Sequence, residues 1–82
     1  MPAQNWDRRL TRIVSTKDGH ALRTLADARA FVIERVPEGY QRRQYWQHAA
    51  KLMMEASEGR ETTEAVTWQL EYALLHDGRA KL

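Results

Sequence analysis

Apolar residues recur at helical spacing in the last two thirds of the 82-residue chain. The first such stretch predicts a helix over residues 25–36, in which Thr24 is an N-cap and Asp27 completes a weak capping box. Pro37 and Gly39 would end this helix. Its inner face would consist of Leu25, Ala28, Val32 and Val36, with Phe31 widening the apolar stripe.

Two further helices follow from the same spacing. One runs from about Tyr40 to Glu58 and stops at Gly59, a residue suited to a left-handed helix end. Its apolar residues are Tyr45, Ala49, Leu52 and Ala56 on one stripe and Trp46, Ala50 and Met53 on the next. The last helix begins near Thr62 or Thr63 and ends before Gly78. It carries one stripe of Val66, Leu70, Ala73 and Leu74 and a second of Ala65, Trp68, Tyr72 and Leu75.

The first 23 residues fit two patterns. Trp6, Leu10, Ile13 and Val14 have helical spacing behind Asn5, which favours a short helix. The β-branched run over residues 11–16 and the turn sequence Lys17-Asp18-Gly19 favour a hairpin instead. We adopt the hairpin, with a type I′ turn at Asp18-Gly19. This turn would place Ser15 opposite Leu22, and Ile13 on the same face as Leu22.

These elements predict a mainly α (α+β) fold, in which a short N-terminal β-hairpin packs on a three-helix bundle. Residues 1–82 would form a single small domain, with the hairpin in residues 1–23 and the three helices in residues 24–82. Hydrophobic residues make up 43% and charged residues 29% of the chain, which is ordinary globular composition. A domain of this size buries only about 60–65% of its unfolded surface, so we expect modest stability.

Charge and composition narrow the function. The net charge of +2 is too small to draw the whole molecule to nucleic acid or to an anionic membrane. The absence of cysteine excludes disulfides, thiolate nucleophiles and thiolate zinc sites. We find neither a membrane-spanning run nor the apolar core of a signal peptide, and we therefore expect a cytoplasmic protein without a membrane partner.

Catalytic chemistry has little support in the sequence. His20, His48 and His76 lack the partner spacing of a metal site, and the four glycines form no phosphate-binding loop. Glu55 and Glu58 share one helix face, but no apolar surroundings are evident that would shift their pKa. We expect no cofactor and no metal, and a small enzyme is the weakest of the function hypotheses.

The arginines suggest an alternative function. Ten of the 13 basic residues are arginine, the residue best suited to bidentate phosphate contacts. Two groups stand out, and they consist of Arg8, Arg9 and Arg12, and of Arg42 and Arg43. An accessory nucleic-acid-binding protein would use these five side chains. No helix-turn-helix signature supports this hypothesis, and the last 22 residues are acidic.

The second stripe of the last helix suggests the main hypothesis. A helix in a bundle needs only one apolar stripe, so Ala65, Trp68, Tyr72 and Leu75 form a surplus apolar surface. Tyrosine and tryptophan are enriched at the centres of protein interfaces. We therefore expect a non-enzymatic protein-interaction module with an adaptor or regulatory role, which binds a protein partner or itself as a homodimer. Alternatively, Trp6 and Leu10 fold back and cover the stripe within one chain.

A family resemblance concerns the structural motifs alone. The chain contains Asp18-Gly19, then Thr24-Leu-Ala-Asp-Ala-Arg29, then Trp46-Gln-His-Ala-Ala50. This order resembles a group of small bacterial proteins with a "DG" turn, a "TLADAR" helix and a "W-x-x-A-A" helix, for which no activity is known. That group often has Leu-Pro after the first helix, where this chain has Val36-Pro37. The resemblance implies the hairpin and assigns no functional residue.

Overall fold

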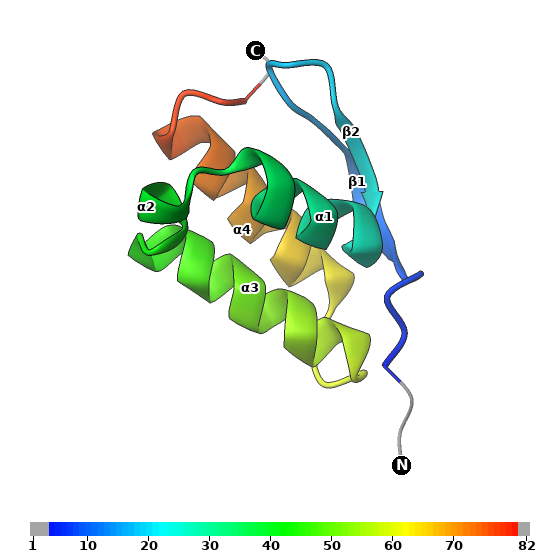
Figure 1. Cartoon of the computed structure of the whole chain (residues 1–82). Helices are drawn as coiled ribbons and strands as arrows, with labels where there is room; N and C mark the ends of the chain where they lie inside the picture. Colours follow the sequence, from blue (N-terminus) through cyan, green and yellow to red (C-terminus); the bar gives the residue numbers. More distant parts are fainter. Residues whose placement is uncertain (1–3, 81–82) are drawn as a thin grey trace.

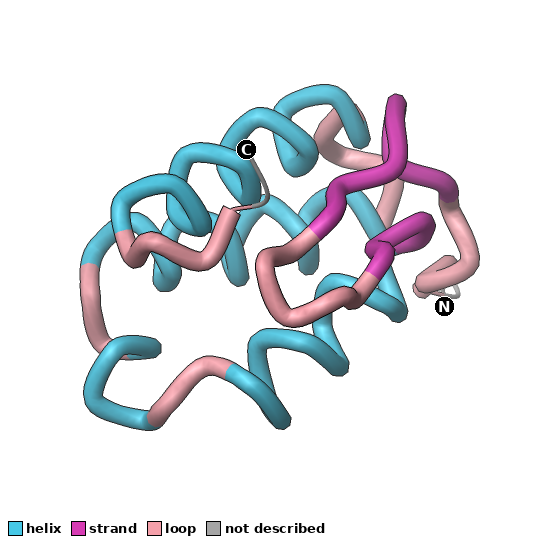
Figure 2. Tube along the Cα trace, turned by 90° about the horizontal axis from the view of Figure 1, so that it is seen from above, coloured by secondary structure: helices cyan, strands magenta, loops and turns pink. Residues whose placement is uncertain are grey.

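The computed structural model describes residues 4–80 and has the predicted fold, a two-stranded antiparallel hairpin beside a group of helices (Figures 1 and 2). The hairpin strands lie together at one side of the helices in Figure 2. In chain order the elements are β1 (Arg9–Ser15), β2 (Ala21–Thr24), α1 (Leu25–Arg35), α2 (Glu38–Gln41), α3 (Gln44–Ser57) and α4 (Thr63–His76).

The hairpin is confirmed, but its predicted register is wrong by one residue. Val14, not Ser15, lies opposite Leu22. The loop contains three residues, 17–19, because the Gly19 N–H bonds the Thr16 carbonyl (3.1 Å) and the Thr16 N–H bonds the His20 carbonyl (2.9 Å). Of the residues in this loop, Gly19 alone has a positive φ, +92°, which fits a type I turn closed by a left-handed glycine and not the type I′ turn.

The extra loop residue decides which side chains enter the core. A shift of one residue moves every side chain of a strand to the other face. Val14 is therefore 3% exposed and packs in the core, whereas Ile13 is 55% exposed. The prediction that Ile13 shares the face of Leu22 is wrong for the same reason.

The first helix begins as the sequence predicts. The Thr24 hydroxyl accepts a hydrogen bond from the Asp27 N–H (3.1 Å), and the Asp27 carboxylate accepts one from the N–H of Arg23 (3.0 Å). The first bond satisfies a backbone donor that a helix start leaves unpaired, whereas the second comes from the residue before the N-cap and so differs from the predicted capping box, in which the Thr24 N–H would be the donor. All five predicted inner residues of this segment are buried, namely Leu25, Ala28, Phe31, Val32 and Val36.

The second predicted helix is divided into two in the structure. Residues 38–41 form the single turn α2, and α3 begins only at Gln44, because Arg43 is extended (φ −67°, ψ 145°). The Gln41 side-chain amide donates to the carbonyls of Val32 (3.0 Å) and Val36 (2.7 Å), and so ties α2 to the end of α1. The prediction of one helix from Tyr40 is wrong, since periodicity alone does not reveal this side-chain contact.

The core lies where the hairpin, α1, α3 and α4 meet. β1 pairs with β2 along one edge and packs against α4, where the Thr11 N–H donates to the Thr67 hydroxyl (3.2 Å). After α4 the chain returns to the hairpin, and Thr16 forms a bridge with Ala80. The structure thus places the first strand between its hairpin partner and the last helix.

Candidate interaction face

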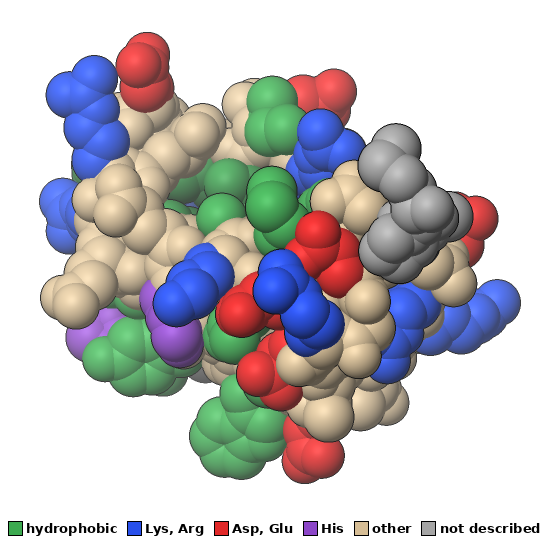
Figure 3. Space-filling view, turned by 90° about the horizontal axis from the view of Figure 1, so that it is seen from below, with side chains coloured by type: hydrophobic (Ala, Val, Ile, Leu, Met, Phe, Trp, Pro, Cys, Tyr) green, Lys and Arg blue, Asp and Glu red, His purple; other side chains and the backbone are tan. Residues whose placement is uncertain are grey.

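Three of the seven large hydrophobic side chains that are exposed in the described structure lie on the outer face of α4. We define the α4 outer face as Ala65, Trp68, Tyr72 and Leu75, the second stripe of the sequence analysis. Trp68 is 64% exposed, Leu75 59% and Tyr72 50%, while Ala65 is half-buried. In Figure 3, hydrophobic side chains protrude at one edge of the surface, with acidic side chains on one side and histidines on the other.

The core fixes the orientation of this face. The opposite side of α4 carries Val66, Leu70, Ala73 and Leu74, and each of these is at most 1% exposed. The helix starts at a capped residue, because the Thr62 hydroxyl accepts from the Ala65 N–H (3.2 Å). Rotating α4 to hide Trp68 would therefore expose core residues, so the outer face cannot turn inward.

The N-terminal segment does not cover the α4 outer face. The Trp6 ring lies beside α1, with the Arg29 guanidinium 4.8 Å from its centroid, and the Trp6 carbonyl accepts from the Ala26 N–H (2.8 Å). Leu10 is buried in the core. The alternative in which Trp6 and Leu10 shield the second stripe is therefore wrong.

An open groove of about 620 Å³ runs between α3 and α4 beside this face. It is lined by Gln44, Tyr45, Gln47, His48, Lys51, Gln69 and Tyr72. At one end the His76 ring lies 4.4 Å from the Tyr72 ring and 5.4 Å from the Tyr45 ring, measured between centroids. The Gln69 amide donates to the Tyr45 carbonyl (3.0 Å) and holds the two helices together. The polar and aromatic side chains of the groove thus extend the surface of the α4 outer face toward α3.

The two flanks of the α4 outer face differ in charge. Glu64 and Glu71 lie on the flank next to β1, where Glu71 forms a two-point ion pair with Arg12. Lys51 and His48 lie on the α3 flank, across the groove. A binding partner that covers the whole face would meet an acidic edge and a basic edge.

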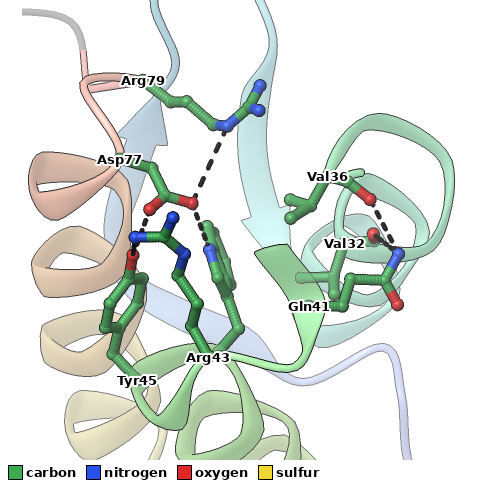
Figure 4. Close-up of polar contacts among 8 residues, drawn as sticks. Val32, Val36, Gln41, Arg43, Tyr45, Asp77 and Arg79 are labelled. Carbon is green, nitrogen blue, oxygen red and sulfur yellow. Dashed lines mark hydrogen bonds and ion pairs between the residues drawn. The ribbon is translucent and has the colours of Figure 1, made fainter. Parts of the chain in front are cut away.

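A buried carboxylate that the sequence analysis missed anchors the end of α4. The side chain of Asp77 is only 1% exposed and accepts hydrogen bonds from the Trp46 indole (2.6 Å) and the Tyr45 hydroxyl (Figure 4). The pKa of Tyr45 is raised, mainly by the hydrogen bond to the Asp77 carboxylate and secondly by burial, so the hydroxyl keeps its proton. The only available signal was an acidic residue between the last helical position and Gly78.

The five arginines of the nucleic-acid hypothesis fall into two separate groups. Arg8 donates to the carbonyls of Ala56 and Glu61 at the C-terminal end of α3, whereas Arg43 is the N-cap of that helix. A helix of 14 residues is about 20 Å long, so Arg8 lies far from Arg43. Arg12 pairs with Glu71 and Arg42 with Glu38 (3.5 Å). Arg9 is exposed.

The described part of the chain contains no cluster of side chains typical of a metal site. Residues 4–80 contain no group of three or more histidine, aspartate or glutamate side chains that could hold a metal ion. His20 bonds Asp18 (2.9 Å), and His76 stacks on tyrosines. None of the described helices is both long enough and apolar enough to cross a membrane.

Comparison of the chain with protein-family models, curated proteins and solved structures gives no match. The resemblance to the small bacterial proteins with the "TLADAR" helix therefore stays a prediction.

Proposed function

We infer that this protein is a non-enzymatic protein-interaction module that binds a second copy of itself through the α4 outer face. The observation that carries this proposal is the exposure of Trp68, Tyr72 and Leu75 in one row, on a helix whose other side is fully buried. The largest exposed apolar patch of a soluble domain is often a functional contact surface.

The size of the exposed patch supports a dimer contact that extends beyond α4. A buried aromatic side chain contributes about 150–250 Å² of surface, so the exposed parts of Trp68, Tyr72 and Leu75 amount to about 300 Å². A stable interface buries about 800 Å² on each partner. The α4 outer face is therefore suited to be the apolar centre of an interface, and the groove and the charged flanks would form its rim.

The charges of the flanks favour one arrangement of the two copies. A two-fold axis parallel to α4 places the Glu64 flank of each copy over the Lys51 flank of the other. An axis perpendicular to the helix and lying in the interface plane would instead bring like flanks together, which is unfavourable. We therefore propose a two-fold dimer in which the two α4 helices run parallel.

Sedimentation equilibrium at tens of micromolar tests the proposal. We expect the mass of a dimer for the wild-type chain, and the mass of a folded monomer for Trp68→Glu. The matched control is Ile33→Glu on α1, because Ile33 is also highly exposed (61%) but lies on a different helix. A monomeric wild-type chain, or equal dissociation by Ile33→Glu, would contradict the proposal.

Charge reversal tests the arrangement separately from the dimer itself. Glu64→Lys and Lys51→Glu should each weaken the dimer, since each would place like charges opposite one another. The double variant restores opposite charges and should recover most of the wild-type affinity. Failure of the double variant to recover affinity would exclude the parallel arrangement while leaving the α4 outer face as the interface.

A further inference from the structure

A second hollow lies beside the loop of the hairpin, and no residue of the α4 outer face lines it. It has a volume of about 310 Å³, at the small end of the range for ligand sites. It is lined by Lys17, Asp18, Phe31, Gly78 and Arg79. The hairpin loop, α1 and the segment after α4 thus each contribute to its wall.

The two basic side chains of this hollow have unused hydrogen-bonding capacity. The Arg79 Nε is buried without a hydrogen-bond acceptor, and its contact with the Asp77 carboxylate is 3.9 Å long. The end of the Arg79 guanidinium points away from Asp77 (Figure 4). Within residues 4–80, Lys17 forms no ion pair. Because the Nε faces Asp77, the donors left for a ligand are the outer nitrogens of the Arg79 guanidinium and the Lys17 ammonium.

The nearby carboxylates are occupied by other donors. Asp77 accepts from the Trp46 indole and the Tyr45 hydroxyl. Asp18 accepts from the Thr16 hydroxyl and bonds the His20 ring (2.9 Å). Asp18 and Asp77 balance the formal charges of Lys17 and Arg79, but their hydrogen bonds go to other side chains, so the Lys17 ammonium and the outer nitrogens of Arg79 form no hydrogen bond within residues 4–80.

The backbone holds Arg79 in place before any ligand arrives. The Arg79 N–H donates to the Leu74 carbonyl (2.8 Å), and the Arg79 carbonyl accepts from the Lys17 N–H (2.7 Å). The guanidinium carbon lies 5.4 Å from the centroid of the Tyr40 ring. A side chain that is already positioned loses little conformational freedom when it binds an anion.

We propose that this hollow binds the oxyanion group of a small molecule, a carboxylate or a phosphate, through Arg79 and Lys17. The planar guanidinium offers two parallel donors to such a group, and the lysine ammonium adds a second positive charge. The site is independent of the α4 outer face and does not require the dimer.

Titration with acetate and with inorganic phosphate, followed by NMR at pH 7 and constant ionic strength, tests the proposal. We expect saturable shifts of the Arg79 Nε–H signal and of the Lys17 and Gly78 amide signals. Stronger binding of one probe would identify the preferred oxyanion. Arg79→Gln and Lys17→Gln should each raise the half-saturating concentration at least about fivefold.

The matched control is Arg23→Gln. It removes one positive charge from the exposed side of β2 and should change the half-saturating concentration less than twofold. The amide spectrum of each variant shows whether the fold is intact, and Lys17→Gln keeps the test informative if Arg79→Gln does not fold. Linear shifts without saturation for both probes, or an equal loss in Arg23→Gln, would overturn the proposal.

Discussion

Replacement of Asp77 by alanine tests the role of the buried carboxylate at the end of α4. This side chain is 1% exposed and is the acceptor for the Trp46 indole N–H, at 2.6 Å, and for the Tyr45 hydroxyl. Alanine removes the acceptor and leaves the indole donor inside the core, because Trp46 is itself 1% exposed.

The expected loss of stability follows from these two donors. An unpaired buried donor costs about 1–3 kcal/mol, and a hydrogen bond to a charged group is at the upper part of that range. Tyr45 is only half-buried, so its hydroxyl can turn to water and contributes less. We therefore expect Asp77→Ala to lower the free energy of unfolding by about 3 kcal/mol. A domain of this length has only about 4–12 kcal/mol in total.

Urea denaturation followed by circular dichroism measures this loss, and Asp7→Ala is the matched control. Asp7 is exposed, and its side chain accepts no hydrogen bond from residues 4–80, so the control should change stability by less than about 0.5 kcal/mol. A double-mutant cycle isolates the indole contact. In the Asp77→Ala background, Trp46→Phe should cost about 2 kcal/mol less than in the wild-type chain, because it removes a donor that is already unpaired.

Two results would refute this reasoning. One is a loss below about 1 kcal/mol for Asp77→Ala, which would mean that water replaces the lost acceptor. The other is strict additivity of Asp77→Ala and Trp46→Phe, which would mean that the two side chains do not interact.

Three further predictions concern the hairpin. Gly19→Val should lower the free energy of unfolding by about 1–2 kcal/mol in thermal denaturation, because the φ of +92° strains any residue with a Cβ; unchanged stability would contradict the turn geometry. Val14→Ala should cost about 2 kcal/mol and Ile13→Ala less than about 0.5 kcal/mol, since only Val14 is buried; the reverse order would restore the register predicted from the sequence. Hydrogen bonds with the Thr16 hydroxyl, the larger cause, and with the His20 ring lower the pKa of Asp18 from 3.8 to about 2. The stabilising effect of the Asp18 carboxylate is therefore complete above pH 4 and is lost as the pH falls toward 2. Acid unfolding of Asp18→Asn should accordingly be less steep between pH 4 and 2, and an unchanged acid limb would contradict the bond network.

The helical part of the fold was largely predictable from the sequence because its signals are local. The Thr24 and Thr62 caps and the buried stripes of α1 and α4 follow from spacing within one helix. The hairpin register was not predictable in the same way. It depends on whether the Asp18-Gly19 loop contains two or three residues, and both forms accept the same sequence.

The candidate sites show the same division. The α4 outer face was predicted because a second apolar stripe is visible in one segment. The Asp77 contacts with Tyr45 and Trp46, and the hollow at Arg79, depend on residues more than 30 positions apart. Their proximity results from the packing of α3 and of the C-terminal segment, which no local pattern encodes.

The packing of the first strand on the last helix determines when this chain can fold during synthesis. Thr11 bonds Thr67, Arg12 pairs with Glu71, and Thr16 forms a bridge with Ala80. When only the first 60 residues have left the ribosome, β1, α1 and α3 are outside, but the helix that covers the apolar side of β1 is not. Contacts between distant residues also slow folding. We therefore expect the nascent chain to stay unfolded until residues 63–80 leave the ribosome, and then to fold as one unit.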